Sequence, residues 1–149
     1  MTGNLWLLDT NVLIRWVQHD DPEAPFVEAA LDQLMLSKDD LCYTSQNLGE
    51  FWNTMTRPAN RNGYGLSPED ADIRARDVEA LFDLLPDSLA VHQEWRRLLV
   101  DYHVSGVQVH DARLVAAMHV HSVKRILTFN TKDFTRFDGI EAVHPADLL

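Results

Sequence analysis

Short apolar runs that alternate with amphipathic segments constrain the fold of this chain more than any other feature. The run at 5–8, LWLL, is continuously apolar, which is typical of a strand buried on both faces of a parallel sheet. The segment 12–17 then takes helical spacing and ends before the sequence DDP at 20–22. Strand and helix repeat in this way along the chain, and this order predicts a mostly parallel sheet with helices on both faces.

The same patterns place the remaining elements. Further strands are expected at 41–44, 88–91, 125–128 and 140–143. Further helices are expected at 25–36, 45–56, 68–85, 92–103 and 111–121. The segment 57–66, RPANRNGYGL, has no periodicity, and its composition predicts a mobile surface loop. We therefore expect one domain over residues 1–149, an α/β fold of three layers (α/β/α) around a central, mostly parallel sheet of four to five strands.

Composition indicates an ordinary globular protein in a reducing compartment. Hydrophobic residues make up 46% of the chain and charged residues 24%, which is typical of soluble domains. The single cysteine, Cys42, excludes an intramolecular disulfide, and the paired spacings of a zinc site are missing. The run at 5–8 is too short for a secretory signal, and no run approaches the roughly 20 apolar residues of a transmembrane helix. We expect a cytoplasmic protein with no membrane partner.

Charge is distributed unevenly along the chain. A formal net charge of -10 argues against a protein that coats nucleic acid by bulk attraction. The charged residues of 19–40 are mostly acids, whereas those of 113–137 are mostly arginine and lysine. Solvated helix and loop faces explain both stretches, but the basic one could instead meet an anionic partner.

Polar residues stand where the predicted strands give way to helices: Asp9, Glu50, Asp111, Asn130 and Asp133. In a parallel sheet such positions converge on the carboxyl edge, where ligands of these folds bind. Each residue also has a structural interpretation. Asp9 and Asp111 could cap helices, and Glu50 could face solvent. Asn130 and Asp133 could simply form a turn.

Taken together, these acids predict a metal site. Three ionised carboxylates in one place would raise one another's pKa, and a divalent cation removes that penalty. Oxygen ligands without cysteine favour Mg²⁺ or Mn²⁺. His119 and His121 do not change this, because a spacing of two on a helix points them to different faces. A hydrated ion of this kind activates water and stabilises a leaving oxygen, which suits phosphodiester hydrolysis.

Four blocks of the sequence resemble the acidic signatures of PIN domains, most closely those of VapC-like toxins from type II toxin–antitoxin pairs. The blocks are LLDTNVLI, TSQNLGEFW, HDARLVAAM and ILTFNTKDF, and they occur in the usual order over almost the whole chain. The resemblance implies a PIN-like fold and a magnesium- or manganese-dependent endoribonuclease. It also implies RNA as substrate, a cognate antitoxin as partner, and a homodimer.

The resemblance assigns roles to single residues. It implies that Asp9, Glu50 and Asp111 are the catalytic acids and bind the metal ion. Thr10 and Asn11 match the small polar residues that help to position the first acid or a metal-bound water.

The fourth block departs from the strongest form of the family pattern. Asn130 stands where many members have an aspartate, and Asp133 follows it. Either Asp133 compensates, or three carboxylates suffice with Asn130 in support, which is the interpretation we favour. Ser45 resembles a hydroxyl residue that members place after the second strand, although a cap for the helix of Glu50 explains it equally.

Four basic residues are candidates for RNA binding: Arg57, Arg61, Arg113 and Lys132. Arg57 and Arg61 belong to the predicted loop, whose Tyr64 could stack on a base. For Arg113 a surface salt bridge is the alternative.

Two other functions remain open from the sequence. A catalytically weakened PIN module would bind RNA or a protein without cleaving, and Asn130 would mark its weakened site. An enzyme of the haloacid-dehalogenase type also begins with an aspartate after an apolar strand, but needs a second aspartate where this chain has Asn11.

Overall fold

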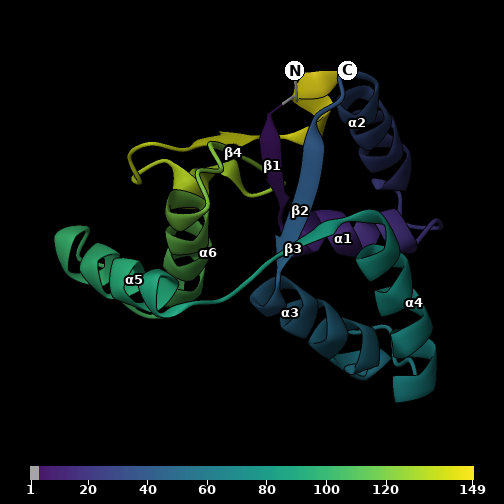
Figure 1. Ribbon diagram of the computed structural model, residues 1–149. Helices are drawn as coiled ribbons and strands as arrows, with labels where there is room; N and C mark the ends of the chain where they lie inside the picture. Colours follow the sequence, from purple (N-terminus) through teal and green to yellow (C-terminus); the bar gives the residue numbers. More distant parts are fainter. Residues whose placement is uncertain (1–3) are drawn as a thin grey trace.

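The computed structural model describes residues 4–149, and its five strands form one parallel sheet in the order β3-β2-β1-β4-β5. The strands are β1 (Leu5–Leu8), β2 (Asp40–Thr44), β3 (Asp83–Leu85), β4 (Arg125–Leu127) and β5 (Glu141–Val143). Because β1 lies in the centre, the chain builds the sheet outward in one direction through β2 and β3, then in the other through β4 and β5 (Figure 1). The strand order reverses beside β1, and ligands of open α/β sheets bind at such a point.

Six α-helices cover the two faces of the sheet, which confirms the predicted three-layer α/β/α arrangement (Figure 1). One layer contains α1 (Thr10–Val17), α2 (Ala24–Leu36), α3 (Ser45–Thr56) and α4 (Pro68–Leu81). The other contains α5 (Leu89–Asp101) and α6 (Gln108–Val120), which pack against each other. Short 3₁₀ turns occur at Ala59–Arg61, Thr131–Phe134 and Pro145–Leu148. Among the described helices, none has the length and apolar character needed to cross a bilayer.

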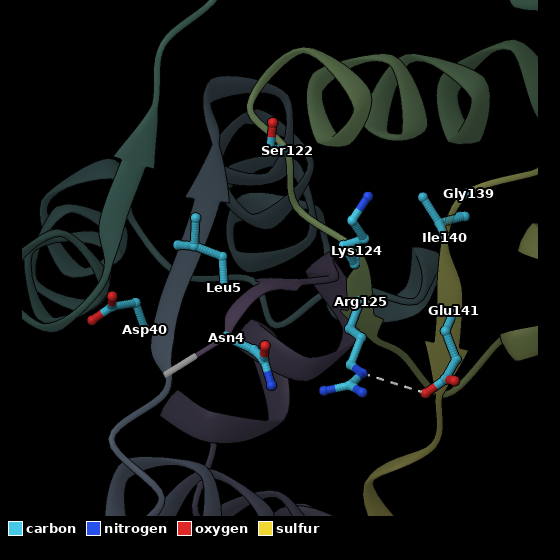
Figure 2. A pocket seen from close by; sticks show the side chains of 9 residues that line it. All are labelled: Asn4, Leu5, Asp40, Ser122, Lys124, Arg125, Gly139, Ile140 and Glu141. Atoms are coloured by element: carbon cyan, nitrogen blue, oxygen red, sulfur yellow. Dashed lines mark ion pairs between the residues drawn. The ribbon is translucent and has the colours of Figure 1, made fainter. Parts of the chain in front are cut away.

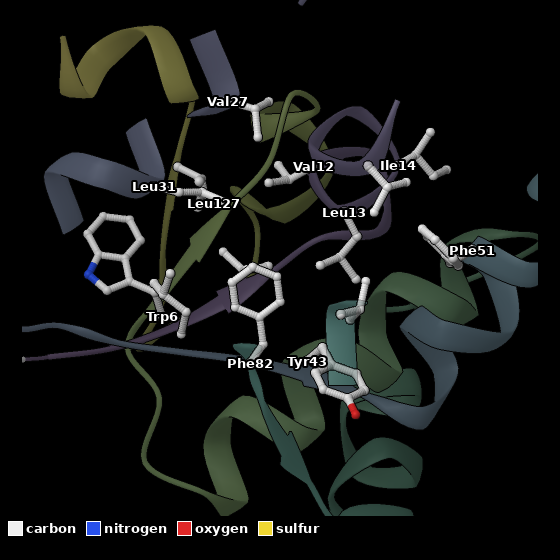
Figure 3. Close-up of a cluster of buried hydrophobic side chains, with 14 of the residues drawn as sticks. Trp6, Val12, Leu13, Ile14, Val27, Leu31, Tyr43, Phe51, Phe82 and Leu127 are labelled. Atoms are coloured by element: carbon white, nitrogen blue, oxygen red, sulfur yellow. The ribbon is translucent and has the colours of Figure 1, made fainter. Parts of the chain in front are cut away.

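The strand side chains alternate between two hydrophobic clusters, one on each face. Trp6 of β1 packs in the cluster with α1 to α4 (Figure 3). Leu8 belongs to the same cluster, whereas Leu7 packs in the cluster with α5 and α6. In β4, Leu127 packs in the cluster with α1 to α4, and Ile126 packs in the cluster with α5 and α6. Burial on both faces explains why these strands are continuously apolar instead of alternating with polar residues.

The third strand lies at a different place from the predicted one. We expected a helix to residue 85 and a strand at 88–91, but α4 ends at Leu81 and β3 spans Asp83–Leu85. Ser88 instead caps α5, with its hydroxyl oxygen 3.3 Å from the backbone nitrogen of Val91. As an edge strand, β3 pairs only with β2 and leaves Leu84 half exposed, so it lacks the apolar pattern of the central strands.

The segment 57–66 is more ordered than its sequence predicts. It contains a 3₁₀ turn and folds back along the end of α3, where the amides of Tyr64 and Leu66 donate to carbonyls of that helix. Both side chains also pack against the hydrophobic cluster of that layer. These contacts come from residues outside the segment, so the local composition gave no sign of them.

Candidate active site

Strand β1 delivers Asp9 to the carboxyl edge of the sheet. The amide of Asp9 donates to the carbonyl of Leu127 in β4 at 3.0 Å, and the next residue begins α1. One carboxylate oxygen accepts the Thr10 amide at 2.8 Å, and the other accepts the Thr128 hydroxyl at 2.7 Å. The side chain is only 8% exposed. Asp9 therefore caps α1, which confirms the capping interpretation, and this role leaves its carboxylate at the carboxyl edge of the sheet.

Burial raises the pKa of Asp9 to about 6. The hydrogen bonds from Thr128 and Thr10 act in the opposite direction because they favour the ionised carboxylate. The negative charges of Glu50 and Asp133 contribute to the raised pKa, so both of these acids lie within electrostatic range of Asp9.

These acids line one cavity of about 380 Å³ at the carboxyl edge of β1 and β4. We call it the acid pocket; it is defined by Asp9, Glu50, Asp111 and Asp133. Thr10, Asn11 and Asn130 also line it. The structure therefore brings together residues from all four sequence blocks.

Glu50 is held in the pocket by residues of α1 and α3. Its Oε1 accepts the Thr10 hydroxyl at 2.7 Å, and the Thr10 oxygen in turn accepts the side-chain amide of Asn47 at 3.1 Å. Asn47 is fully buried and forms a capping box with Thr44 at the start of α3. Thr10, which directly follows Asp9, thus ties the helix that carries Glu50 to the start of α1.

Asp111 reaches the acid pocket from the first turn of α6. The helix begins at Gln108, so Asp111 is not the cap that one interpretation expected. The pKa of Asp111 is raised to about 7, first by burial and then by the charges of the other three pocket acids, whereas Arg136 acts to lower it. Its carboxylate accepts no hydrogen bond from the described residues, so nothing of the kind that holds Asp9 offsets this repulsion.

Asn130 and Asp133 both line the acid pocket, from the turn that follows β4. The backbone amide of Asn130 donates to the Thr128 hydroxyl oxygen at 3.0 Å. The charge of Asp133 raises the pKa of both Asp9 and Asp111, which places a fourth carboxylate near them. Both residues thus remain candidates for the fourth position, and Asp133 is the one that carries a charge.

Ser45 is not the cap of α3. It is the exposed first residue of α3 and does not line the acid pocket. The cap is Thr44, whose hydroxyl oxygen accepts the amide of Asn47 at 3.2 Å. Because β2 passes directly into α3, the cap lies one residue earlier than the sequence pattern suggested.

Of the basic residues considered for RNA binding, only Arg57 lines the acid pocket. Arg61 and Lys132 are exposed outside it. Arg113 is 3.5 Å from Asp87 and lies over the ring of Trp95, which agrees with the salt-bridge alternative.

Sequence reasoning missed Thr128, Asn47 and Arg15. Thr128 is fully buried and bonds Asp9 across the sheet, and Asn47 supports Thr10. The available signal for Thr128 was a hydroxyl residue directly after a buried strand, in the same block as Asn130. Arg15 lies four residues after Asn11 on α1 and lines the pocket.

A more spacious cavity of about 690 Å³ lies at the amino edge of the sheet, away from these acids (Figure 2). Its lining includes Lys124 and the ion pair of Arg125 with Glu141, at 3.6 Å. It contains none of the acids whose pKa is raised. Acids with a raised pKa that lie together in a cleft indicate a functional site, so the acid pocket is the better candidate.

The donor set of the acid pocket fits a hydrated divalent cation. Within residues 4–149, no three histidine, cysteine, aspartate or glutamate side chains are close enough to form a ready-made metal site. Magnesium, however, is usually held by one or two carboxylates and keeps several waters, so it does not need such a cluster. Burial is the main cause of the raised pKa values of Asp9 and Asp111, and the charges of neighbouring acids add to it. A bound cation would offset both effects, because it favours the ionised carboxylates.

A family model for the PIN domain matches residues 6–140, which is most of the chain. The protein belongs to the PIN domain family. No curated protein sequence matches it significantly.

Solved structures show the same PIN fold. VapBC2 from Rickettsia felis, bound to a promoter DNA fragment, matches with a TM-score of 0.71 at 14% identity, over 94% of this chain and 98% of that one. VapC20 from Mycobacterium tuberculosis, described as a sarcin-ricin loop cleaving toxin, matches with a TM-score of 0.65 at 14% identity, over 88% and 94%. A toxin–antitoxin complex from Klebsiella pneumoniae matches with a TM-score of 0.64 at 21% identity, over 93% and 96%. At these identities the similarity establishes the fold.

Proposed function

We propose that this PIN domain is a metal-dependent endoribonuclease that hydrolyses RNA phosphodiester bonds. The observation that carries the proposal is the convergence of Asp9, Glu50, Asp111 and Asp133 on one pocket at the carboxyl edge of the sheet. Family membership supports it, because PIN nucleases generally use divalent metal ions.

Asp9, Asp111 and Glu50 would hold a Mg²⁺ or Mn²⁺ ion, one or two of them directly and the others through waters that the ion keeps. Such an ion lowers the pKa of a bound water and stabilises charge on the leaving oxygen of a phosphodiester. The chain itself contributes orientation. Thr128 and the Thr10 amide fix the Asp9 carboxylate from two sides, and the Thr10 hydroxyl fixes Glu50. Ligands held in this way need not reorganise when a cation and a phosphate enter.

We also propose that the protein is the toxin of a toxin–antitoxin pair. The support is its fold, which is shared with VapC20 and with chains of the VapBC2 and Klebsiella complexes. A small antitoxin would bind the chain and block access to the acid pocket. The open reading frame next to its gene is the place to look for this partner, which should suppress growth arrest when it is co-expressed.

The test of the enzymatic proposal replaces Asp9 with Asn. Expression of the wild type should arrest growth, and the purified protein should cleave RNA in Mg²⁺ or Mn²⁺ and stop when a chelator is added. Asp9→Asn should lose both effects, because it removes one charge and disturbs the bond from Thr128. Asp32→Asn on the exposed face of α2 is the matched control and should behave as the wild type. Equal toxicity of Asp9→Asn and the wild type would contradict the proposal.

Calorimetric titration with Mn²⁺ separates this enzyme from a catalytically weakened module. A nuclease should bind the ion in a manner that depends on Asp9 and Asp111. RNA binding without cleavage and without Asp9-dependent metal binding would instead identify a module that only recognises RNA.

A further inference from the structure

Two arginines line the acid pocket beside its carboxylates, and they are the only basic side chains among its described lining residues. Arg15 belongs to α1, and Arg57 follows the last turn of α3. Asn11 and Arg15 share one face of α1 because they are four residues apart. Since the side-chain amide of Asn11 lies 3.4 Å from Asp9, Arg15 is directed to the same side of the helix as the acids.

The head of Arg15 is fixed by packing. Its Nη1 donates to the carbonyl of Asn11 at 3.1 Å, and its guanidinium carbon lies 4.7 Å from the centre of the Phe129 ring. Its Nε is buried, 3.8 Å from Asp21, and finds no hydrogen-bond acceptor in the described chain. An arginine free to extend into water would avoid leaving that donor unpaired. The side chain is nevertheless 30% exposed, so part of the held cation remains accessible.

The loop after α3 holds Arg57 in a similar way. Its Nη2 donates to the carbonyl of Asn62 at 2.8 Å, and its Nε is also buried without an acceptor in the described residues. Asn62 adopts the left-handed conformation, with φ of 63°. A Cβ on Gly63 would lie 1.9 Å from the Arg57 carbonyl oxygen, so this close approach requires glycine. The turn that looked like an ordinary surface loop thus supports a pocket residue.

We propose that Arg15 and Arg57 bind RNA backbone phosphates next to the one that is cut at the carboxylates. This inference rests on the proposed function. RNA brings a negative charge with each nucleotide to a pocket of four acids, in a protein whose net charge is -10. Positively charged side chains near the pocket must offset that repulsion. The planar guanidinium of arginine suits this role, because its N–H groups match the geometry of two phosphate oxygens. Arg15 Nη2 and Arg57 Nη1 make no hydrogen bond to the described residues, which leaves donors for this contact.

Binding of a fluorescein-labelled single-stranded RNA tests the inference, measured by anisotropy in Ca²⁺. The variants are Arg15→Met and Arg57→Met, which keep an apolar stem, and Arg15→Lys, which keeps the charge. Each Met variant should weaken binding about tenfold and reduce the slope of log affinity against log salt by about 0.7, the loss of one phosphate contact. Arg15→Lys should keep the wild-type slope. Arg96→Met, at an exposed position on α5, is the control and should match the wild type.

Unchanged affinity and unchanged salt slope in both Met variants would overturn the inference, provided that thermal unfolding shows them folded. Gly63→Ala gives an independent result, because it should reduce the slope by displacing Arg57 while the guanidinium remains present. Kinetics with Mg²⁺ should show a raised KM of the Met variants at nearly constant kcat.

An acidic protein is the alternative ligand for these two arginines, and a polyglutamate peptide tests for it. If binding of the peptide depends on the arginines while binding of RNA does not, the surface recognises an acidic protein and the inference is overturned. Wild-type protein that binds RNA through these arginines but never cleaves it would instead contradict the proposed function alone.

Discussion

Replacing Asp111 with Asn should stabilise the metal-free protein at alkaline pH. The pKa of Asp111 is raised from 3.8 to about 7 by burial and by the charges of the other pocket acids. A group whose pKa is higher in the folded than in the unfolded chain stabilises the fold at low pH. That contribution is lost as the pH rises through the folded pKa. Above pH 7 the folded protein therefore carries the full cost of the ionised carboxylate, which asparagine would remove.

The size of the effect follows from the pKa. A rise of about three units corresponds to ~4 kcal/mol at 1.36 kcal/mol per unit. Asp111 is only half buried, and solvent screening reduces this to ~2 kcal/mol. For a chain of 149 residues that is a rise in Tm of roughly 4–8 °C. The gain should fall below half at about pH 5, because there the folded wild type is protonated and keeps most of its stability.

The Tm difference between Asp111→Asn and the wild type is measured by thermal unfolding in the presence of a chelator, followed by circular dichroism at pH 8.5 and at pH 5. Asp32→Asn, an exposed acid outside the pocket, is the matched control and should shift Tm little at either pH. Added Mg²⁺ should stabilise the wild type more than Asp111→Asn, since a ligand that binds only the folded state raises its stability. A Tm for Asp111→Asn at or below that of the wild type at pH 8.5 would refute the reasoning.

Two further variants test the hydrogen bonds and charges of the pocket. Thr128→Val should lower the free energy of unfolding by about 1–3 kcal/mol and reduce RNA cleavage, because it removes the bond to Asp9 and the acceptor for the Asn130 amide. Thr128→Ser should restore both, and equal stability of the Val variant and the wild type in urea titration would exclude this role. Asp133→Asn should weaken Mn²⁺ binding more than Asn130→Ala does, and should move the acid limb of the pH–rate profile to lower pH, because its charge raises the pKa of Asp9 and Asp111. The opposite order of metal affinities would give the fourth position to Asn130.

The sequence by itself determined the fold class, the family and three of the pocket acids. Buried parallel strands need continuous apolar runs, and helices need their own periodicity, so local patterns carry this information. Asp9 was identifiable because a strand of the pattern LWLL can end only at the edge of the sheet, next to the helix that follows. Glu50 and Asp111 were identifiable because the blocks around them resemble the family signatures.

Only the tertiary structure decided how the acids are held and what lies beside them. Thr128 and Asp9 are 119 residues apart in sequence, and Thr10 and Glu50 are 40 apart, so no local pattern could pair them. The edge strand β3 escaped prediction for the same reason, since its only partner is β2. The side-by-side pairing of β1 with β4 brings Thr128 to Asp9, and the packing of α3 against α1 brings Glu50 to Thr10. These long-range contacts convert isolated polar residues into one pocket with raised pKa values, and this is why the site, unlike the strands, is a property of the folded chain.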